Sequence, residues 1–161
     1  MSRKSDARSP LGFASIGLVR PKTPANVGGV LRAAYAYGVA QVVISGNRSG
    51  DIRHGTNTSR AERHMPVVVV DDLLAVRPYD TPIVAVDLVP NACPLPDFRH
   101  PSRAFYVFGP EDGTLGGEII RAATHRVMVP TRTCMNLAAC VNVVLYDRMA
   151  KGYAFAREGA S

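Results

Sequence analysis

Apolar residues gather in six short runs that alternate with longer amphipathic stretches along the chain. Each run is rich in β-branched side chains and apolar at nearly every position; the runs cover residues 13–19, 41–44, 67–70, 83–86, 105–108 and 126–129. Continuous apolar runs are typical of strands that are covered on both faces. The pattern therefore predicts an α/β fold, a mainly parallel sheet with helices on both faces, with an ordinary doubly wound nucleotide fold as the alternative.

The first amphipathic stretch predicts a helix with well-marked ends. Asn26 is a favourable N-cap residue, and Gly38 supplies a C-terminal stop. Between them, four apolar residues recur at helical spacing: Val27, Val30, Leu31 and Ala34. Arg32 points away from this stripe and shares its side of the helix with Gly28 and Gly29, whose missing side chains allow another backbone or a ligand to approach closely.

The rest of the chain predicts two more helices, over residues 115–124 and 136–151, and a long loop over the proline-bearing stretch 90–101. The last helix is apolar on more than one side, so we expect a partner subunit, in a homodimer, to cover it. With 161 residues, 47% of them apolar, the chain has enough apolar surface for one core. We therefore expect a single domain over residues 11–161 behind a flexible basic tail, residues 1–10.

Arginine dominates the positive charge of the chain. Lys and Arg together number 19 against 13 Asp and Glu, the net charge is +6, and 16 of the 19 cations are arginine. The guanidinium fork matches the geometry of phosphate, so the composition fits a phosphate-bearing partner. A merely basic soluble protein fits the charge equally well.

Cysteine usage indicates a reducing compartment. Cys93, Cys134 and Cys140 form no CxxC pair and have no ligand spacing with the four histidines, which disfavours a disulfide scaffold and a structural metal. No apolar run approaches the roughly 18 to 20 residues of a membrane span, and the polar first ten residues are unlike a signal peptide. We expect a cytoplasmic protein with neither a metal nor a membrane partner.

Several common catalytic signatures are absent from the sequence. There is no GxGxxG after the first apolar run, no phosphate-binding GxxxxGK[ST], no HExxH and no GxSxG. These absences disfavour an ordinary dinucleotide enzyme, an NTPase, a zinc protease and a serine hydrolase.

Three segments instead follow expected strands at their carboxyl ends, where α/β sheets bind ligands: residues 24–32, 108–115 and 129–136. Each has a plain structural explanation when taken alone. Asn26 and Asn136 fit as helix caps, Arg32 as a solvated surface residue, and 108–113 as a surface turn in which Glu111 is hydrated. Their occurrence together and in this order is what favours a functional interpretation.

In this order the segments resemble the motifs of the SpoU/TrmH-type branch of the SPOUT methyltransferases, over residues 16–149. The matching residues are Asn26, Gly28 and Arg32 in the first motif, Phe108 to Glu111 with Gly113 and Leu115 in the second, and Cys134, Met135, Asn136 and Leu137 in the third. The third motif is most similar to that of the small tRNA wobble-position (TrmL-like) subgroup. The chain departs from the family in having Cys134 where serine is usual, and from the subgroup in a shorter loop at 130–134 and a longer basic segment at 47–64.

The resemblance implies a deep trefoil knot at the C-terminal end of the domain, where the chain threads through a loop to form the cofactor pocket. The implied cofactor is S-adenosylmethionine (AdoMet). The residues expected to bind it are Val86, Gly109, Val129, Cys134, Met135 and Leu137.

The implied reaction is methylation of an RNA ribose, in which a 2′-hydroxyl attacks the sulfonium methyl group without a metal. Arg32 is the expected principal catalytic residue. Because a guanidinium stays protonated, we expect it to hold an RNA phosphate and stabilise the developing alkoxide. Asn26 and Glu111 are expected to orient Arg32, Asn136 completes the catalytic set, and the proton leaves through phosphate or water.

The expected RNA contacts are six basic residues: Arg20, Lys22, Arg48, Arg53, Arg60 and Arg63. The stretch 47–64, which holds four of them, fits an ordinary solvated loop equally well. We expect tRNA as the substrate and keep rRNA as the alternative. A catalytically idle, knotted RNA-binding protein is the alternative of another class, supported by Cys134 alone; base methylation, as in the guanine-N1 branch, is disfavoured by the Asn26, Arg32 and Asn136 motifs.

Overall fold

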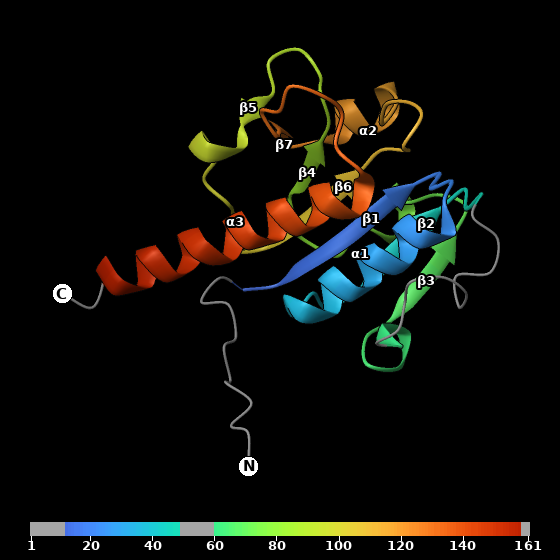
Figure 1. Cartoon of the computed structure of the whole chain (residues 1–161), viewed down its shortest axis with the longest axis horizontal. Helices are drawn as coiled ribbons and strands as arrows, with labels where there is room; N and C mark the ends of the chain where they lie inside the picture. Colours follow the sequence, from blue (N-terminus) through green and yellow to red (C-terminus); the bar gives the residue numbers. More distant parts are fainter. Residues whose placement is uncertain (1–11, 49–59, 159–161) are drawn as a thin grey trace.

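A parallel sheet organises the computed structural model, which describes residues 12–48 and 60–158 (Figure 1). Within those residues the strands are β1 (Ala14–Val19), β2 (Val42–Ser45), β3 (Val67–Val70), β4 (Ile83–Val86), β5 (Cys93–Pro94), β6 (Ala104–Phe108) and β7 (His125–Met128). Their order is β3-β2-β1-β6-β4-β7-β5, and all neighbours are parallel. The six apolar runs coincide with strands to within one residue at each end, so the predicted parallel α/β sheet is confirmed.

Helices cover both faces of the sheet, as predicted. The α-helices are α1 (Pro24–Ala36), α2 (Gly117–Ala122) and α3 (Leu137–Glu158), and the short 3-10 helices are η1 (Ala61–Arg63), η2 (Leu74–Val76) and η3 (Leu95–Asp97). Helices α1 and α3 lie side by side over one face (Figure 1). Helix α2 and the segment around η2 pack on the other face.

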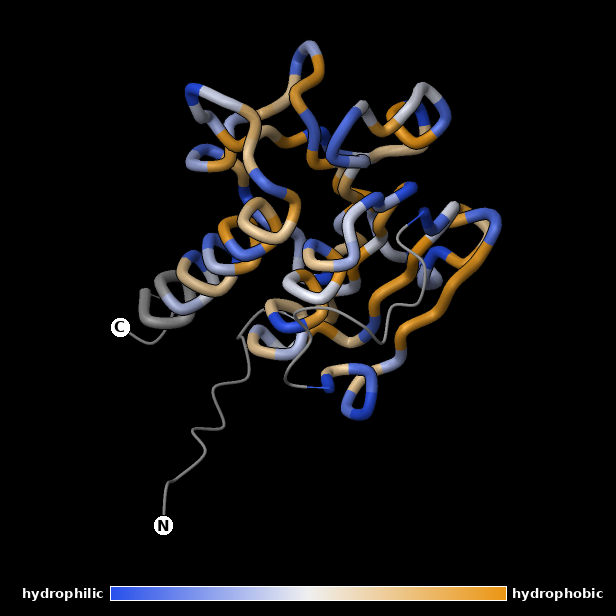
Figure 2. Tube along the Cα trace, turned by 45° about the vertical axis from the view of Figure 1, so that its right-hand side comes forward, coloured by the Kyte–Doolittle hydropathy of each residue, from blue (hydrophilic) through white to orange (hydrophobic). Residues whose placement is uncertain are grey.

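The core consists of two apolar layers, one on each face of the sheet. Along the central strand β6, Tyr106 and Phe108 point into the layer under α1 and α3, whereas Phe105 and Val107 point into the layer under α2. All four side chains are buried, which is the burial that their continuous apolar run predicts. In the hydropathy-coloured trace the strands are mostly orange in the interior, while the blue segments lie at turns and helix surfaces (Figure 2).

The start of α1 differs from the expectation that Asn26 caps it. Thr23 is the N-cap residue and Pro24 the first helical residue, so Asn26 lies inside the first turn. The cause is Pro24, whose fixed φ and missing N–H suit the first position of a helix. The backbone N–H groups of Asn26 and Val27 both donate to the Thr23 carbonyl. The predicted stop is confirmed, because Gly38 has a φ of +68° just beyond the helix.

Three other expectations need correction. Strand β3 is not covered on both faces, because it is the edge strand and leaves Val68 and Val69 exposed. The expected loop at 90–101 contains β5 and η3; a two-residue strand with a proline gives no apolar run to detect. Helix α3 continues to Glu158, past the expected end at residue 151. The tail at residues 1–10 lies outside the described residues.

None of the helices in the described ranges is long and apolar enough to span a membrane.

Candidate active site

A cavity opens at the carboxyl ends of β4, β6 and β7, three neighbouring strands of the sheet. Three segments supply its wall: the end of β4, the turn after β6, and the connection from β7 into α3. The residues that line it include all six expected to bind the cofactor: Val86, Gly109, Val129, Cys134, Met135 and Leu137. Segments that are distant in sequence thus meet at the edge of the sheet where α/β folds bind ligands.

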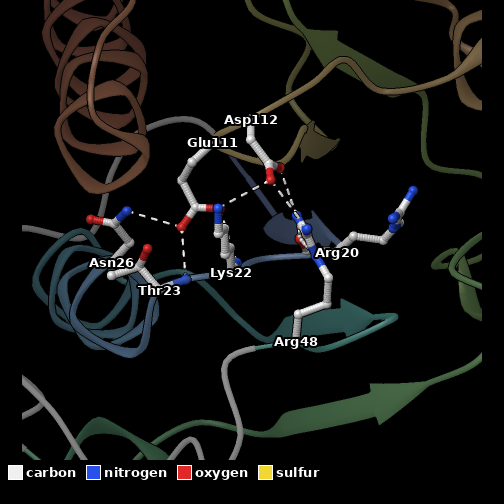
Figure 3. A network of polar contacts seen from close by, with 7 residues as sticks. All are labelled: Arg20, Lys22, Thr23, Asn26, Arg48, Glu111 and Asp112. Carbon is white, nitrogen blue, oxygen red and sulfur yellow. Dashed lines mark hydrogen bonds and ion pairs between the residues drawn. The ribbon is translucent and has the colours of Figure 1, made fainter.

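Glu111, in the turn after β6, accepts three hydrogen bonds from the segment that begins α1. Its Oε2 accepts from the Lys22 backbone N–H (2.9 Å), and its Oε1 accepts from the Thr23 backbone N–H (3.1 Å) and from Asn26 Nδ2 (2.9 Å) (Figure 3). Partial burial opposes ionisation of the carboxyl group, but the bonds from Asn26 and from the backbone outweigh it and lower the pKa of Glu111. The side chain is therefore a carboxylate that ties the second motif to the first.

Asn136 ties the third motif to the same group. Its Nδ2 donates to Asn26 Oδ1 (2.6 Å), while its own Oδ1 accepts from the backbone N–H groups of Ala138 (2.9 Å) and Ala139 (3.2 Å). The two bonds that Oδ1 accepts make Asn136 the N-cap residue of α3. Asn136 is thus both a helix cap and a bridge between motifs. We call Asn26, Glu111 and Asn136 the motif network.

Asp87 also lines the cavity, and the sequence interpretation missed it. It directly follows β4; its Oδ1 accepts from the Leu88 backbone N–H (2.7 Å) and its Oδ2 from the Leu115 backbone N–H (2.9 Å). An acidic residue immediately after a buried strand was the signal that could have identified it. The nearby Cys140 thiol has its pKa raised to about 11 by burial and by the charge of Asp87, so it stays protonated.

No group of three or more His, Cys, Asp or Glu side chains suited to hold a metal ion occurs within the described ranges, 12–48 and 60–158.

The model of the SpoU rRNA Methylase family matches residues 14–146. The chain belongs to this family. No curated protein matches the chain in sequence.

Solved structures share the fold of this family member. AviRb, a SpoU methyltransferase from Streptomyces viridochromogenes that has also been crystallised with AdoMet, is 19% identical with a TM-score of 0.77 over 96% of this chain and 66% of AviRb. An RNA 2′-O ribose methyltransferase is 21% identical with a TM-score of 0.73 over 93% of this chain and 60% of that one. The A. aeolicus TrmH/SpoU tRNA modifying enzyme is 17% identical, with a TM-score of 0.77 over 93% of this chain and 82% of that one. The chain therefore spans less than two thirds of AviRb and of the 2′-O ribose methyltransferase.

Arg32, expected to act with the motif network, lies apart from it in this SpoU family chain. It is exposed on α1, six residues beyond Asn26, which is about 9 Å along a helix axis. It is not among the residues that line the cavity. Within the described residues, the hydrogen bonds of Asn26 and Glu111 join the motifs to one another rather than to Arg32.

Three of the expected RNA-binding residues gather beside the second family motif. Arg48 forms a bidentate pair with Asp112, through Nη2 to Oδ1 (2.7 Å) and Nη1 to Oδ2 (3.2 Å), and Lys22 lies 3.4 Å from the same carboxylate (Figure 3). These bonds hold the pKa of Asp112 well below its usual range. Arg20 is exposed, and its guanidinium extends away from Asp112 (Figure 3).

The other expected RNA-binding residues lie farther along the chain. Arg60 and Arg63 are exposed at η1, next to a stacked pair in which the rings of Tyr35, from α1, and His64 have centroids 4.9 Å apart. Arg53 lies outside the described residues. Of the residues expected to bind RNA, those that the structure describes thus form two groups: Arg20, Lys22 and Arg48 beside the second motif, and Arg60 and Arg63 at η1.

Proposed function

We propose that the protein is an AdoMet-dependent RNA 2′-O-ribose methyltransferase. The observation that carries the proposal is the motif network, which joins the three family motifs by hydrogen bonds next to the cavity lined by the six expected cofactor-binding residues. Membership of the SpoU family supports the same activity, as do the AdoMet complex of AviRb and the shared fold of an RNA 2′-O ribose methyltransferase.

The cavity suits AdoMet in its apolar lining and in its charge. Its apolar wall, from Val86, Leu88, Val129, Met135 and Leu137, suits the adenine ring. The negative charge of Asp87, a residue that lines the cavity, suits a sulfonium cation. Gly109 lets the 114–115 backbone pack closely against the turn that lines the cavity, because a Cβ there would lie 3.3 Å from the Leu115 backbone nitrogen. When bound, AdoMet supplies an electrophilic methyl group.

The protein contributes positioning and charge stabilisation. The motif network holds the turn after β6 and the start of α3 in fixed relation to α1, so the cavity wall does not have to reorganise when substrate binds. We assign to Arg32 the holding of an RNA phosphate and stabilisation of the alkoxide that forms on the 2′-oxygen. Because guanidinium is a poor base, the hydroxyl proton passes to phosphate or water.

We favour tRNA over rRNA as the substrate. The Cys-Met-Asn-Leu wording of the third motif, residues 134–137, resembles the tRNA wobble-position subgroup. A tRNA modifying enzyme is also the structural relative whose chain is matched over the greatest part, 82%, among the three described above. Both substrates would place the protein in the cytoplasm.

We further propose that the protein is a homodimer. On α3, a stripe of exposed residues recurs at helical spacing: Ala139, Val143, Tyr146, Ala150 and Tyr153. Tyr35 and Ala36 are exposed on the neighbouring α1. A second copy that covered this face would bury the apolar side chains, and Arg32 would lie at its border.

The implied knot remains part of the proposal. The helix that follows the threaded segment is anchored by Arg148, which is buried and donates hydrogen bonds to the carbonyls of Pro101 and Ser102 and to those of Gly12 and Phe13. The C-terminal helix is thus held against the residues just before β1 and those just before β6.

The test is AdoMet calorimetry followed by transfer of labelled methyl groups to total RNA from cells that lack the gene. We expect binding in a 1:1 ratio and RNA-dependent incorporation of label, with Arg77→Ala, on the opposite side of the sheet from the motif network, as a control that behaves like wild type. Absence of AdoMet heat would favour the idle RNA-binding protein. Binding without incorporation would overturn the assignment as an enzyme.

A further inference from the structure

Arg48, which follows β2, joins its own segment to two others at the edge of the active site: the loop after β1 and the turn after β6. Its two terminal nitrogens bind Asp112, in the turn after β6 (2.7 and 3.2 Å). Its Nε and Nη2 also donate to the Arg20 carbonyl (3.1 and 2.9 Å), in the loop after β1. Its backbone N–H donates to the Pro21 carbonyl (3.0 Å). With so many of its donors engaged inside the protein, Arg48 is poorly placed to bind RNA directly.

The Arg20 backbone has a conformation that needs this support. Its φ is +50°, in the left-handed region that residues other than glycine seldom adopt. The Arg20 N–H donates to the Ser45 carbonyl (2.7 Å), and its own carbonyl is fixed by Arg48. Bonds on both sides of the residue therefore hold the left-handed conformation in place.

Gly46 leaves room for the Arg20 side chain in the direction that the left-handed backbone gives it. A Cβ at Gly46 would lie 2.9 Å from Arg20 Cγ, so the stem of Arg20 lies directly against a position that has no side chain. The guanidinium beyond this stem is exposed and turned away from Asp112 (Figure 3). Within the described residues, no hydrogen bond or ion pair of this guanidinium is observed. Among Arg20, Lys22 and Arg48, Arg20 thus combines a guanidinium that faces solvent with a backbone fixed by hydrogen bonds on both sides.

We propose that Arg48, held by Asp112, is a positioning residue that fixes Arg20 in its left-handed conformation and so presents the Arg20 guanidinium to a phosphate of the substrate RNA. We call Arg20, Arg48 and Asp112 the arginine clamp. The inference rests on the proposed RNA substrate. It separates two residues that share a charge: Arg20 makes the contact, and Arg48 acts through Arg20.

Binding of bulk tRNA, and separately of bulk rRNA, from cells that lack the gene tests the clamp through the dependence of Kd on salt. Arg20→Ala should weaken binding of the substrate RNA about tenfold. It should also reduce the magnitude of the slope of log K against log salt by about one, the change expected for the loss of one phosphate contact. Arg48→Lys should cause nearly the same loss although it keeps the charge, because lysine lacks the fork that reaches Asp112 and the Arg20 carbonyl together. Arg77→Ala, which removes a distant charge, should bind like wild type.

The double variant Arg20→Ala/Arg48→Lys should bind no more weakly than Arg20→Ala alone, because the two residues act as one unit. AdoMet affinity should stay within twofold of wild type in all of these variants. Asp112→Asn, which keeps the shape of the partner but removes its charge, gives a second route to the same loss if Arg48→Lys is poorly folded.

Two results overturn the clamp while leaving the proposed function intact: wild-type RNA binding by both Arg48→Lys and Asp112→Asn, or losses from Arg20→Ala and Arg48→Lys that multiply in the double variant. The second result would make Arg48 a direct phosphate contact. If wild type neither binds RNA nor transfers methyl groups to it, the proposed function fails and the clamp fails with it.

Discussion

The Asn136 side-chain amide has two roles, one for its oxygen and one for its nitrogen. Its oxygen caps α3, and its nitrogen donates to Asn26, which in turn donates to Glu111. Such a chain of bonds fixes the amide orientations, since Glu111 as a carboxylate accepts only from the nitrogen end of Asn26. Replacement of a single atom can therefore separate the structural part of the network from its functional part.

Asn136→Asp makes this separation. Aspartate is as good a helix cap as asparagine, so the melting temperature should change by no more than a few degrees. The donor to Asn26 is lost, and a carboxylate would face the Asn26 oxygen at the position now 2.6 Å away. We expect methyl transfer to fall about tenfold or more. Asn142→Asp, on the same helix, is the matched control; an equal loss there, or none at Asn136, would contradict the role of the network.

Arg32 is assigned to RNA rather than to the cofactor because it lies outside the cavity wall. Arg32→Ala should abolish methyl transfer and leave AdoMet affinity nearly unchanged in calorimetry. Arg32→Lys should fail almost as badly, because lysine lacks the planar fork that holds phosphate through two bonds. Full activity of Arg32→Ala would remove Arg32 from the mechanism, and loss of AdoMet binding would move it into the cofactor pocket.

Helix α3 is anchored by a buried polar cluster at the end of the sheet opposite to the cavity. His100 lies between the Tyr106 hydroxyl (2.6 Å) and Asp147 (2.8 Å), and Arg148 donates to the same hydroxyl (3.1 Å). Burial raises the pKa of Tyr106 to about 12, so its hydroxyl stays protonated. Burial lowers the pKa of His100 and outweighs the opposing effect of Asp147.

Because the folded protein binds the His100 proton less readily than the unfolded chain, stability should fall in acid. The contribution is complete above the ordinary histidine pKa of about 6.5 and is lost as the pH falls below it, by at most about 1.4 kcal/mol per pH unit. Urea midpoints between pH 8 and pH 5 measure this slope. His100→Gln should flatten it, whereas His64→Gln, at an exposed site, should not. An unchanged slope in His100→Gln would show that other groups cause it.

The elements that the sequence predicts well are those with a local signal. β1 to β4 and β6 each contain a continuous apolar run, β7 begins with His125 and Arg126 but leads into the apolar stretch 127–129, and β5 has only Cys93 and Pro94. The six cavity residues expected to bind the cofactor were predictable from the family resemblance, whereas Asp87, which also lines the cavity, was not. The pairing of Asn26 with Asn136, 110 residues apart, and of Arg48 with Asp112, 64 apart, was not, because local patterns contain no information about which polar groups the topology brings together.

Over the whole molecule, α1 and α3 lie side by side on one side of the sheet (Figure 1), and within the described residues their outer surface exposes Tyr35, Val143, Tyr146 and Tyr153. Tyr146 is 57% exposed on it, and Tyr153, two turns later, is 37% exposed. Exposed aromatic residues aligned on one helix are typical of an interface. This face explains why α3 is apolar on more than one side.

Tyr146→Glu tests the dimer. Light scattering of wild type should give twice the chain mass of 17.3 kDa, and Tyr146→Glu should shift the protein toward monomer, because a buried charge at the interface would lack a partner. Tyr79→Glu, at a tyrosine that is 91% exposed away from α3, is the control. A wild-type protein that is monomeric and active at micromolar concentration would contradict the homodimer.

The proposed function requires that the methyl group goes to a ribose 2′-oxygen, and alkaline hydrolysis of the labelled RNA product distinguishes this oxygen from a base atom. A methylated 2′-oxygen cannot attack the neighbouring phosphate, so the label should be recovered in alkali-resistant dinucleotides, whereas unmodified RNA is reduced to mononucleotides. Wild type should give this product and Arg32→Ala should give none. Recovery of the label in mononucleotides methylated on the base would rule out ribose methylation.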